Sequence, residues 1–109
     1  MDSALIAAAA DIAKLCALHG VERLDVFGSA AADTPATPPN DYDFVVQLAD
    51  SQGDSKARRW LALAQGLELV LGKPVDLVSA ATIRNPHFAR ALHATRVALY
   101  ERPRPQAAV

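Results

Sequence analysis

Apolar residues near the start of the chain recur every three or four positions, which predicts a helix over residues 3–19. The expected inward stripe consists of Leu5, Ala9, Ile12 and Cys16, with Leu15 beside them. Ser3 is suited to cap the start of this helix, and Gly20 is suited to end it. His19 is expected to face solvent in the last turn, where a positive charge suits the helix dipole. We therefore interpret this helix as part of the scaffold.

Two short apolar runs after this helix are typical of β-strands. The first covers residues 23–27 and ends at Gly28, with one helical turn expected from Ser29 onward. A loop over residues 33–40 contains three prolines, which exclude a helix or a central strand there. The second strand covers residues 41–48, and its side chains alternate between two faces. One face carries Asp41, Asp43, Val45 and Gln47, and the other carries Tyr42, Phe44, Val46 and Leu48.

The second half of the chain again alternates helices with strands. After a polar loop over residues 50–55, a helix is predicted over residues 55–71, followed by a short strand over residues 75–78. The inward stripe of this helix is expected to contain Trp60, Ala64, Leu67 and Leu71. Asn85 followed by proline predicts a third helix, which precedes a last strand over residues 96–100. The inward residues of the third helix are expected to be Phe88 and Leu92.

Length and composition are those of one globular domain. The chain has 109 residues, enough for one core and too few for two, and 51% of them are hydrophobic. Together with the order of helices and strands, this predicts an α/β domain over residues 1–102, with a small mixed β-sheet flanked by helices. Residues 103–109 are expected to form a flexible tail.

Charge, cysteine content and hydropathy exclude several classes of protein. The net charge of −1 argues against nucleic acid as the main ligand, because duplex binding needs a basic face. Cys16 is the only cysteine, so no internal disulfide is possible. Asp2 and Asp11 interrupt the apolar start where a secretion signal would need an unbroken run, and no run is long enough to cross a membrane. We therefore expect a cytoplasmic protein.

Three aspartates stand in predicted strands, where this residue is uncommon because its side chain competes for backbone hydrogen bonds. Asp41 and Asp43 share one strand face, so their α-carbons are roughly 6.5–7 Å apart. Asp76 lies in another apolar run, which we expect to be a central strand beside the first two aspartates. Like charges this close repel, whereas a divalent cation between them reverses the sign of the interaction. The pattern therefore predicts a site for Mg²⁺, which prefers oxygen ligands and leaves positions open for phosphate.

Each of these residues also has a purely structural interpretation. Asp41 alone is compatible with a turn that follows two prolines and an asparagine. Asp76 is compatible with an ion pair to Arg84 or Arg96. Ser29 is a suitable helix cap, which does not conflict with phosphate binding, because free N–H groups at a helix start bind anions. The combination of all three aspartates with the glycine and serine favours the metal site.

This ordered set resembles the signature of the minimal nucleotidyltransferases of the DNA polymerase β superfamily. In that family a strand ends in Gly-Ser, a loop follows, Asp-x-Asp opens the next strand, and a third Asp lies on a later strand. The matching residues here are Gly28, Ser29, Asp41, Asp43 and Asp76. The resemblance covers roughly residues 24–100 and implies a polymerase β-like nucleotidyltransferase fold.

The resemblance also implies a role for each matching residue. Gly28 and Ser29 would hold the β- and γ-phosphates of a nucleoside triphosphate. Asp41 and Asp43 would bind two Mg²⁺ ions, and Asp76 would complete the catalytic site. The implied reaction transfers a nucleoside monophosphate, AMP from ATP in the favoured interpretation, to a hydroxyl group of a partner protein. Small members of the family act as antitoxins beside a helical HEPN-type toxin, so such a toxin is the expected partner.

The sequence departs from the family pattern immediately after Ser29. The family continues with alanine, arginine and glycine, whereas this chain continues with Ala31, Ala32 and Asp33. The missing arginine would contact phosphate, and Asp33 adds negative charge instead. An antitoxin that neutralises its partner by contact, without catalysis, is therefore the alternative, and a small metal-dependent phosphohydrolase is a third hypothesis. The chain shows no second domain to hold a nucleobase, so either base recognition is loose or a partner completes the pocket.

Overall fold

The computed structural model describes residues 1–32, 39–50 and 55–103. In chain order its elements are α1 (Ser3–Ala7), α2 (Ala9–Leu18), β1 (Val21–Phe27), the 3-10 turn η1 (Gly28–Ala31), β2 (Tyr42–Leu48), α3 (Lys56–Leu71), β3 (Val75–Ser79), the 3-10 turn η2 (Ala80–Thr82), α4 (Pro86–Thr95) and β4 (Val97–Glu101). Asp33, most of the two predicted loops and the end of the predicted tail lie outside the described residues.

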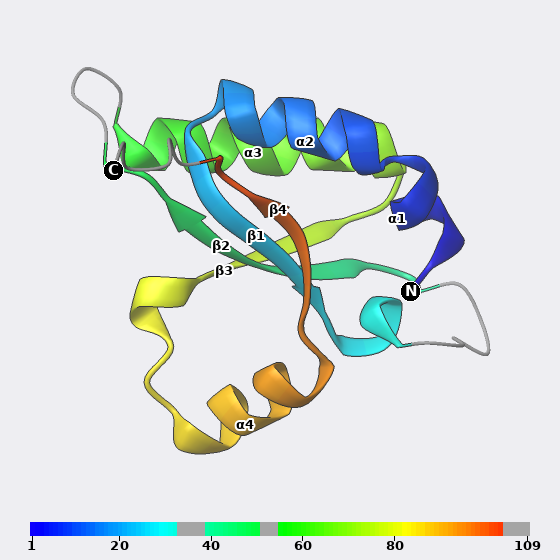
Figure 1. Ribbon diagram of the computed structural model, residues 1–109, viewed down its shortest axis with the longest axis vertical. Coiled ribbons are helices and arrows are strands. Elements are labelled where there is room, and N and C mark those ends of the chain that lie inside the picture. The colour runs from blue at the N-terminus through cyan, green and yellow to red at the C-terminus, as the bar shows by residue number, and fades with distance from the viewer. Residues whose placement is uncertain (33–38, 51–54, 104–109) are drawn as a thin grey trace, which may run out of the picture.

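The four strands form one mixed sheet in the order β3-β2-β1-β4. β1 is antiparallel to both β2 and β4, whereas β2 is parallel to β3. A parallel pair needs a long crossover, and α3 provides it between β2 and β3. Figure 1 shows α2 and α3 side by side on one face of the sheet and α4 on the opposite face. The predicted α/β fold, a small mixed sheet flanked by helices, is confirmed.

The alternation of side chains along the strands builds the core on the face that α2 and α3 cover. The fully buried strand residues on this face include Leu24, Val26, Phe44 and Val46. They pack with Leu5, Ile12, Leu63 and Leu67 from the helices into one cluster. β1 begins earlier than the sequence predicted, because Val21 is buried and pairs with Leu48 at the end of β2.

The N-terminal helix differs from its prediction in its continuity and in its first turn. It is divided at Ala8 into α1 and α2, and Ala8 rather than the predicted Ala9 is buried. Ser3 does not cap α1; Asp2 precedes the first turn instead. The buried carboxylate of Asp2 accepts a hydrogen bond of 2.7 Å from the hydroxyl of Tyr42, so this residue ties the helix to the start of β2.

α3 has nearly the predicted bounds, and the side chain of Ser55 caps it through a hydrogen bond of 3.1 Å. Its buried stripe differs from the prediction: Arg59, Leu63 and Leu67 are buried, while Trp60, Ala64 and Leu71 are only partly buried. The guanidinium of Arg59 donates to the backbone carbonyls of Ala49 at 2.8 Å and Gly20 at 3.0 Å. These bonds engage both terminal nitrogens of the guanidinium, whereas its buried Nε has no hydrogen-bond partner among the described residues. The same arginine donates to the carbonyl of His19, and His19 is partly buried rather than solvent-facing.

In the C-terminal half, the position of β3 differs from the prediction, whereas the start of α4 agrees with it. β3 is an edge strand, so the prediction that Asp76 lies on a central strand was wrong. α4 begins as predicted: the side chain of Asn85 accepts hydrogen bonds of 2.9 and 3.3 Å from two backbone N–H groups, and Pro86 occupies the first turn. Leu92 is buried, whereas Phe88 is 38% exposed. Over the ranges that the structure describes, no helix is long and apolar enough to span a bilayer.

Candidate metal centre

Three carboxylates meet where β2 and β3 begin. The parallel register places Asp43 directly beside Asp76, so both side chains lie on the same face of the sheet. Asp41 precedes β2 by one residue, and one carboxylate oxygen from each of Asp41, Asp43 and Asp76 lies within 4.8 Å of the others. The structure thus brings together the three aspartates that the sequence singled out. We refer to these three residues as the carboxylate cluster.

The electrostatics of the carboxylate cluster are compatible with a cation site. Asp41 and Asp76 are exposed and Asp43 is partly buried. Burial, and then repulsion from Asp41 and Asp76, raises the pKa of Asp43 above its ordinary value. Among the residues that the structure describes, no lysine or arginine forms an ion pair with the carboxylate cluster. Oxygen donors that repel one another and have no protein cation are the ligand set that a hard divalent ion requires.

The glycine and serine after β1 lie next to this cluster. Gly28 has a φ of +76°, which glycine permits, and it lies close to the cluster, because a Cβ added to it would be 3.4 Å from Oδ2 of Asp43. The backbone N–H of Gly28 donates a hydrogen bond of 3.2 Å to the hydroxyl of Thr95 at the end of α4. Ser29 is exposed inside η1 and is not its cap. Ala32, where the family has arginine, is also exposed.

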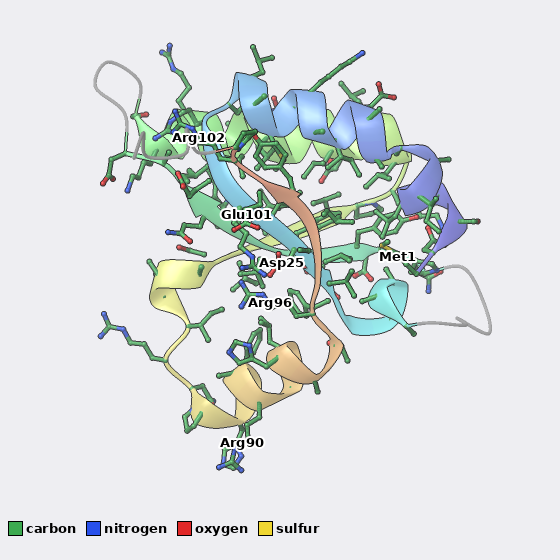
Figure 2. The ribbon with its side chains drawn as sticks, in the orientation of Figure 1. Met1, Asp25, Arg90, Arg96, Glu101 and Arg102 are labelled. Atoms are coloured by element: carbon green, nitrogen blue, oxygen red, sulfur yellow. The ribbon has the colours of Figure 1, made fainter. Side chains whose placement is uncertain are left out.

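A fourth aspartate on this sheet face was not singled out by the sequence. Asp25 is fully buried on β1 opposite Val45, and it therefore shares the face of Asp43. Its carboxylate accepts hydrogen bonds of 3.0 and 3.2 Å from Nε of Arg23 and forms an ion pair with Arg96 (Figure 2). The hydrogen bond to Asp25, followed by its charge, raises the pKa of Arg23.

The ion pair of Asp25 bears on the structural alternative in which Asp76 pairs with Arg84 or Arg96. Arg96 contacts Asp25 and not Asp76, and Arg84 forms no ion pair with a described residue, so the proposed ion pair of Asp76 is wrong. A signal for Asp25 was present in the sequence, because it interrupts an apolar strand as Asp43 does. Arg23, two positions earlier on the same strand face, was the indication that this aspartate is paired.

A cavity of about 550 Å³ lies at the other end of β2 and β3. Its walls include Leu48 and Ser79, the last residues of β2 and β3, whereas Asp43 and Asp76 lie near the starts of these strands. Its two charged lining residues, Asp50 and Lys56, form an ion pair of 2.7 Å with each other. Because this cavity has no unpaired charged group among its described lining residues, the carboxylate cluster is the better candidate for chemistry.

Solved structures share this fold. A protein assigned as a minimal nucleotidyltransferase is 31% identical, with a TM-score of 0.67, over 89% of this chain and 95% of that chain. A toxin–antitoxin structure with AMP-PNP is 25% identical, with a TM-score of 0.63, over 86% of this chain and 73% of that chain. A structure of a tri-AMPylated Shewanella oneidensis HEPN toxin in complex with an MNT antitoxin is 23% identical, with a TM-score of 0.60, over 89% of this chain and 72% of that chain, and shows a shared fold.

The sequence itself matches one protein family. No curated protein matches the chain. The family described as the nucleotidyltransferase domain matches residues 12–103, which include Gly28, Ser29 and the whole carboxylate cluster. The match covers most of the chain, and the strand order and solved relatives agree with it. This protein therefore belongs to the nucleotidyltransferase domain family and has the polymerase β-like fold of that family.

Proposed function

We propose that this protein is a metal-dependent nucleotidyltransferase that moves AMP from ATP to a hydroxyl group of a partner protein. The observation that carries the proposal is the convergence of three carboxylate oxygens within 4.8 Å, with no ion pair to a described lysine or arginine. A fold held by core packing has no need for such a cluster, because like charges at this distance destabilise it. The membership in the nucleotidyltransferase domain family supports the same reaction class.

The carboxylate cluster is proposed to bind two Mg²⁺ ions. When bound, Mg²⁺ would neutralise phosphate charge and lower the pKa of the attacking hydroxyl. Asp43 is suited to be the central ligand, because it lies beside Asp76 on the sheet and two residues after Asp41. Burial, and then repulsion from Asp41 and Asp76, raises its pKa, and a bound cation would relieve that repulsion.

In the proposed reaction, the hydroxyl oxygen of the partner forms a bond to the α-phosphorus of ATP. The bond from that phosphorus to the bridging oxygen of the β-phosphate breaks, and pyrophosphate leaves with the electron pair. The hydroxyl proton passes to Asp76, which is exposed and can act as the base. The leaving phosphates would be held by the hydroxyl of Ser29 and by N–H groups of η1. Ser29 is the more available donor, because Thr95 already occupies the N–H of Gly28.

The proposed partner is a HEPN-type toxin, and the proposed role is that of its antitoxin. One similar structure contains an MNT antitoxin in complex with an AMPylated HEPN toxin. An AMPylated toxin is the product that the proposed reaction would give. Another similar structure, of a toxin–antitoxin, contains the ATP analogue AMP-PNP. A chain of 109 residues that acts on a partner hydroxyl would use that partner to complete the reaction site.

Mass spectrometry of the partner after incubation with this chain, ATP and Mg²⁺ tests the proposal. Each transferred AMP should add about 329 Da, the mass of a phosphodiester-linked adenylyl group. Asp43→Ala should abolish the added mass, and Asp76→Ala should reduce the rate by orders of magnitude. Asp11→Ala, which removes an exposed carboxylate on α2, is the matched control and should leave the rate unchanged.

A contact-only antitoxin is the second candidate, and exposed Ala32 in place of the family's arginine is the observation that favours it. In that case the chain would silence its partner with no mass added from any of the four nucleoside triphosphates. The Asp41→Asn, Asp43→Asn double variant would then neutralise the partner as well as the wild type does. Loss of neutralisation in the double variant would instead support catalysis.

A further inference from the structure

A small cavity lies beside the carboxylate cluster, between β3, η2 and the start of α4. It has a volume of about 300 Å³ and is lined by Val78, Thr82, Ile83, Arg84, Asn85 and Phe88. Val78 follows Asp76 by two residues on β3, so both side chains are on the same face and their α-carbons are roughly 6.5–7 Å apart. Both cavities lie toward the end of β3, but this one is lined by Val78 from the strand face that carries Asp76, whereas the larger one is lined by Ser79, which points to the other face.

An aromatic contact joins the other wall of this cavity to the same site. Phe27 is the register partner of Asp43 across β1 and β2. Its ring meets the ring of Phe88 edge to face, with ring centres 5.9 Å apart and an angle of 68° between the planes. Phe88 is nevertheless 38% exposed, so part of its ring is open to a ligand. The contact with Phe27 fixes the orientation of this ring before a ligand arrives.

The order of these features across the sheet matches the order of groups in a nucleoside triphosphate. The turn at Gly28 follows β1, the carboxylate cluster lies at β2 and β3, and the cavity lies further along β3, the edge strand. In the nucleotide, the α-phosphate stands between the β- and γ-phosphates and the ribose with its base. With the α-phosphate at the carboxylate cluster and the outer phosphates at the turn, the base is directed toward the cavity.

The chemistry of the lining is that of a site for a flat aromatic group with polar edges. Val78, Ile83 and the ring of Phe88 supply apolar surface. Arg84 and the amide nitrogen of Asn85 are hydrogen-bond donors at the rim, since the amide oxygen of Asn85 already caps α4. No acidic side chain is among the described lining residues. The volume is at the lower end of the range for ligand pockets, which suits a nucleobase and is small for a peptide segment.

We propose that this cavity binds the base of the nucleoside triphosphate, stacked on Phe88 with its ring nitrogens toward Arg84 and Asn85. The inference rests on the nucleotidyl transfer proposed above. It assigns base recognition to the chain itself, through the η2 and α4 segment, in place of a second domain or a partner. Removing the stacking of a base on an aromatic side chain should weaken binding roughly ten-fold, which corresponds to about 1.4 kcal/mol.

Calorimetry on the full chain with two Mg²⁺ complexes, ATP and inorganic tripolyphosphate, separates the base from the phosphates. The wild type should bind ATP roughly ten-fold more tightly than tripolyphosphate. Phe88→Leu keeps an apolar side chain and removes the stacking surface, so it should remove this preference and leave tripolyphosphate binding unchanged. Phe88→Trp, which retains an aromatic face, should keep the preference. Arg84→Gln should weaken ATP several-fold, whereas Arg90→Gln should change nothing, because Arg90 points away from the sheet (Figure 2).

Because Phe88→Leu also removes the contact with Phe27, a second variant is needed that blocks the cavity and keeps this contact. Thr82 is exposed on η2, so Thr82→Trp should narrow the cavity without removing a core side chain, and it should also lower ATP binding selectively. If ATP and tripolyphosphate bind the wild type equally, or if Phe88→Leu and Thr82→Trp both leave ATP binding intact, the base site is wrong while nucleotidyl transfer stands. If Phe88→Leu slows AMP transfer without weakening ATP binding, the cavity serves the acceptor and the base site is again wrong. If the wild type binds neither complex, the proposed function itself fails.

Discussion

The carboxylate cluster and Asp25 lie on the same face of one sheet, and their surroundings are opposite. The carboxylate cluster is partly open to solvent and is not paired with any described lysine or arginine. Asp25 is fully buried and contacts Arg23 and Arg96. The more deeply buried carboxylate is therefore the neutralised one, and the accessible carboxylates carry the uncompensated charge.

This difference separates a structural carboxylate from candidate functional ones better than burial alone does. Arg96 follows α4 directly, so its ion pair with Asp25 fastens the end of this helix to β1. Thr95, the neighbouring residue, accepts the hydrogen bond from Gly28. The Asp25–Arg96 ion pair and the Gly28–Thr95 hydrogen bond thus connect the end of α4 to β1 and to the glycine-serine turn, while the carboxylate cluster has no such structural partner among the described residues. The two sites should respond differently to the same kind of substitution.

The largest expected effect is on stability after Asp25→Asn. This change leaves Arg96 partly buried, with 21% of its side chain exposed, and without its charged partner. Removing one partner of such a pair should lower the free energy of unfolding by about 3 kcal/mol, measured by urea denaturation in chelator. Asp43→Asn is the comparison, and it should leave the metal-free protein equally stable or more stable, because it removes repulsion. An equal loss in both variants would show that the carboxylate cluster is also structural.

The two arginines of Asp25 should contribute unequally. Arg96→Leu should lower the free energy of unfolding by about 2 kcal/mol, because the ion pair that it removes is largely buried. Arg23→Leu should cost less than about 1 kcal/mol, since 41% of the Arg23 side chain is exposed and solvent screens its charge. Urea denaturation of both variants tests this order, and a greater loss from Arg23→Leu would contradict it.

Ligand binding should stabilise the protein only through the carboxylate cluster. Mg²⁺ alone should bind weakly, and Mg²⁺ with AMP-PNP should bind better, because phosphate oxygens supply missing ligands. At a ligand concentration ten times the Kd, the free energy of unfolding should rise by about 1.4 kcal/mol. Thermal unfolding should show no such rise in the Asp41→Asn, Asp43→Asn double variant. A rise of the same size in that variant would place the ligand elsewhere.

The smallest effect concerns pH. The pKa of Asp43 is higher in the folded protein than the ordinary value of 3.8, so the folded state binds this proton more tightly than the unfolded chain does. The free energy of unfolding of the metal-free protein should therefore fall as the pH rises from 3.8 through the raised pKa. The stability advantage of Asp43→Asn over the wild type should grow across this window in chelator. An advantage that shrinks with rising pH would mean that a cation stabilises the Asp43 carboxylate.

Local features of the sequence determined most of the elements of this fold. The cap at Asn85, the end of α3 at Gly72, which is in the left-handed conformation, and the alternation along residues 41–48 all depend on neighbours within a few positions. The sequence also predicted that the strand of Asp76 lies beside the strand of Asp41 and Asp43, and the register confirms this. The roles of these residues in metal and phosphate binding stay predictions.

Only the tertiary structure decided which strand lies at the edge of the sheet, which side chains are buried and which charges are paired. β3 carries an apolar run that suits a central strand, yet it lies at the edge, because strand order depends on how the crossover helix packs. Arg59 occupies a buried stripe because the carbonyls of Ala49 and Gly20, distant in sequence, converge on it. Asp25 is neutralised by Arg96, which lies far along the chain and reaches it only when β4 pairs with β1. These outcomes depend on contacts between remote segments, and periodicity along the chain carries no information about them.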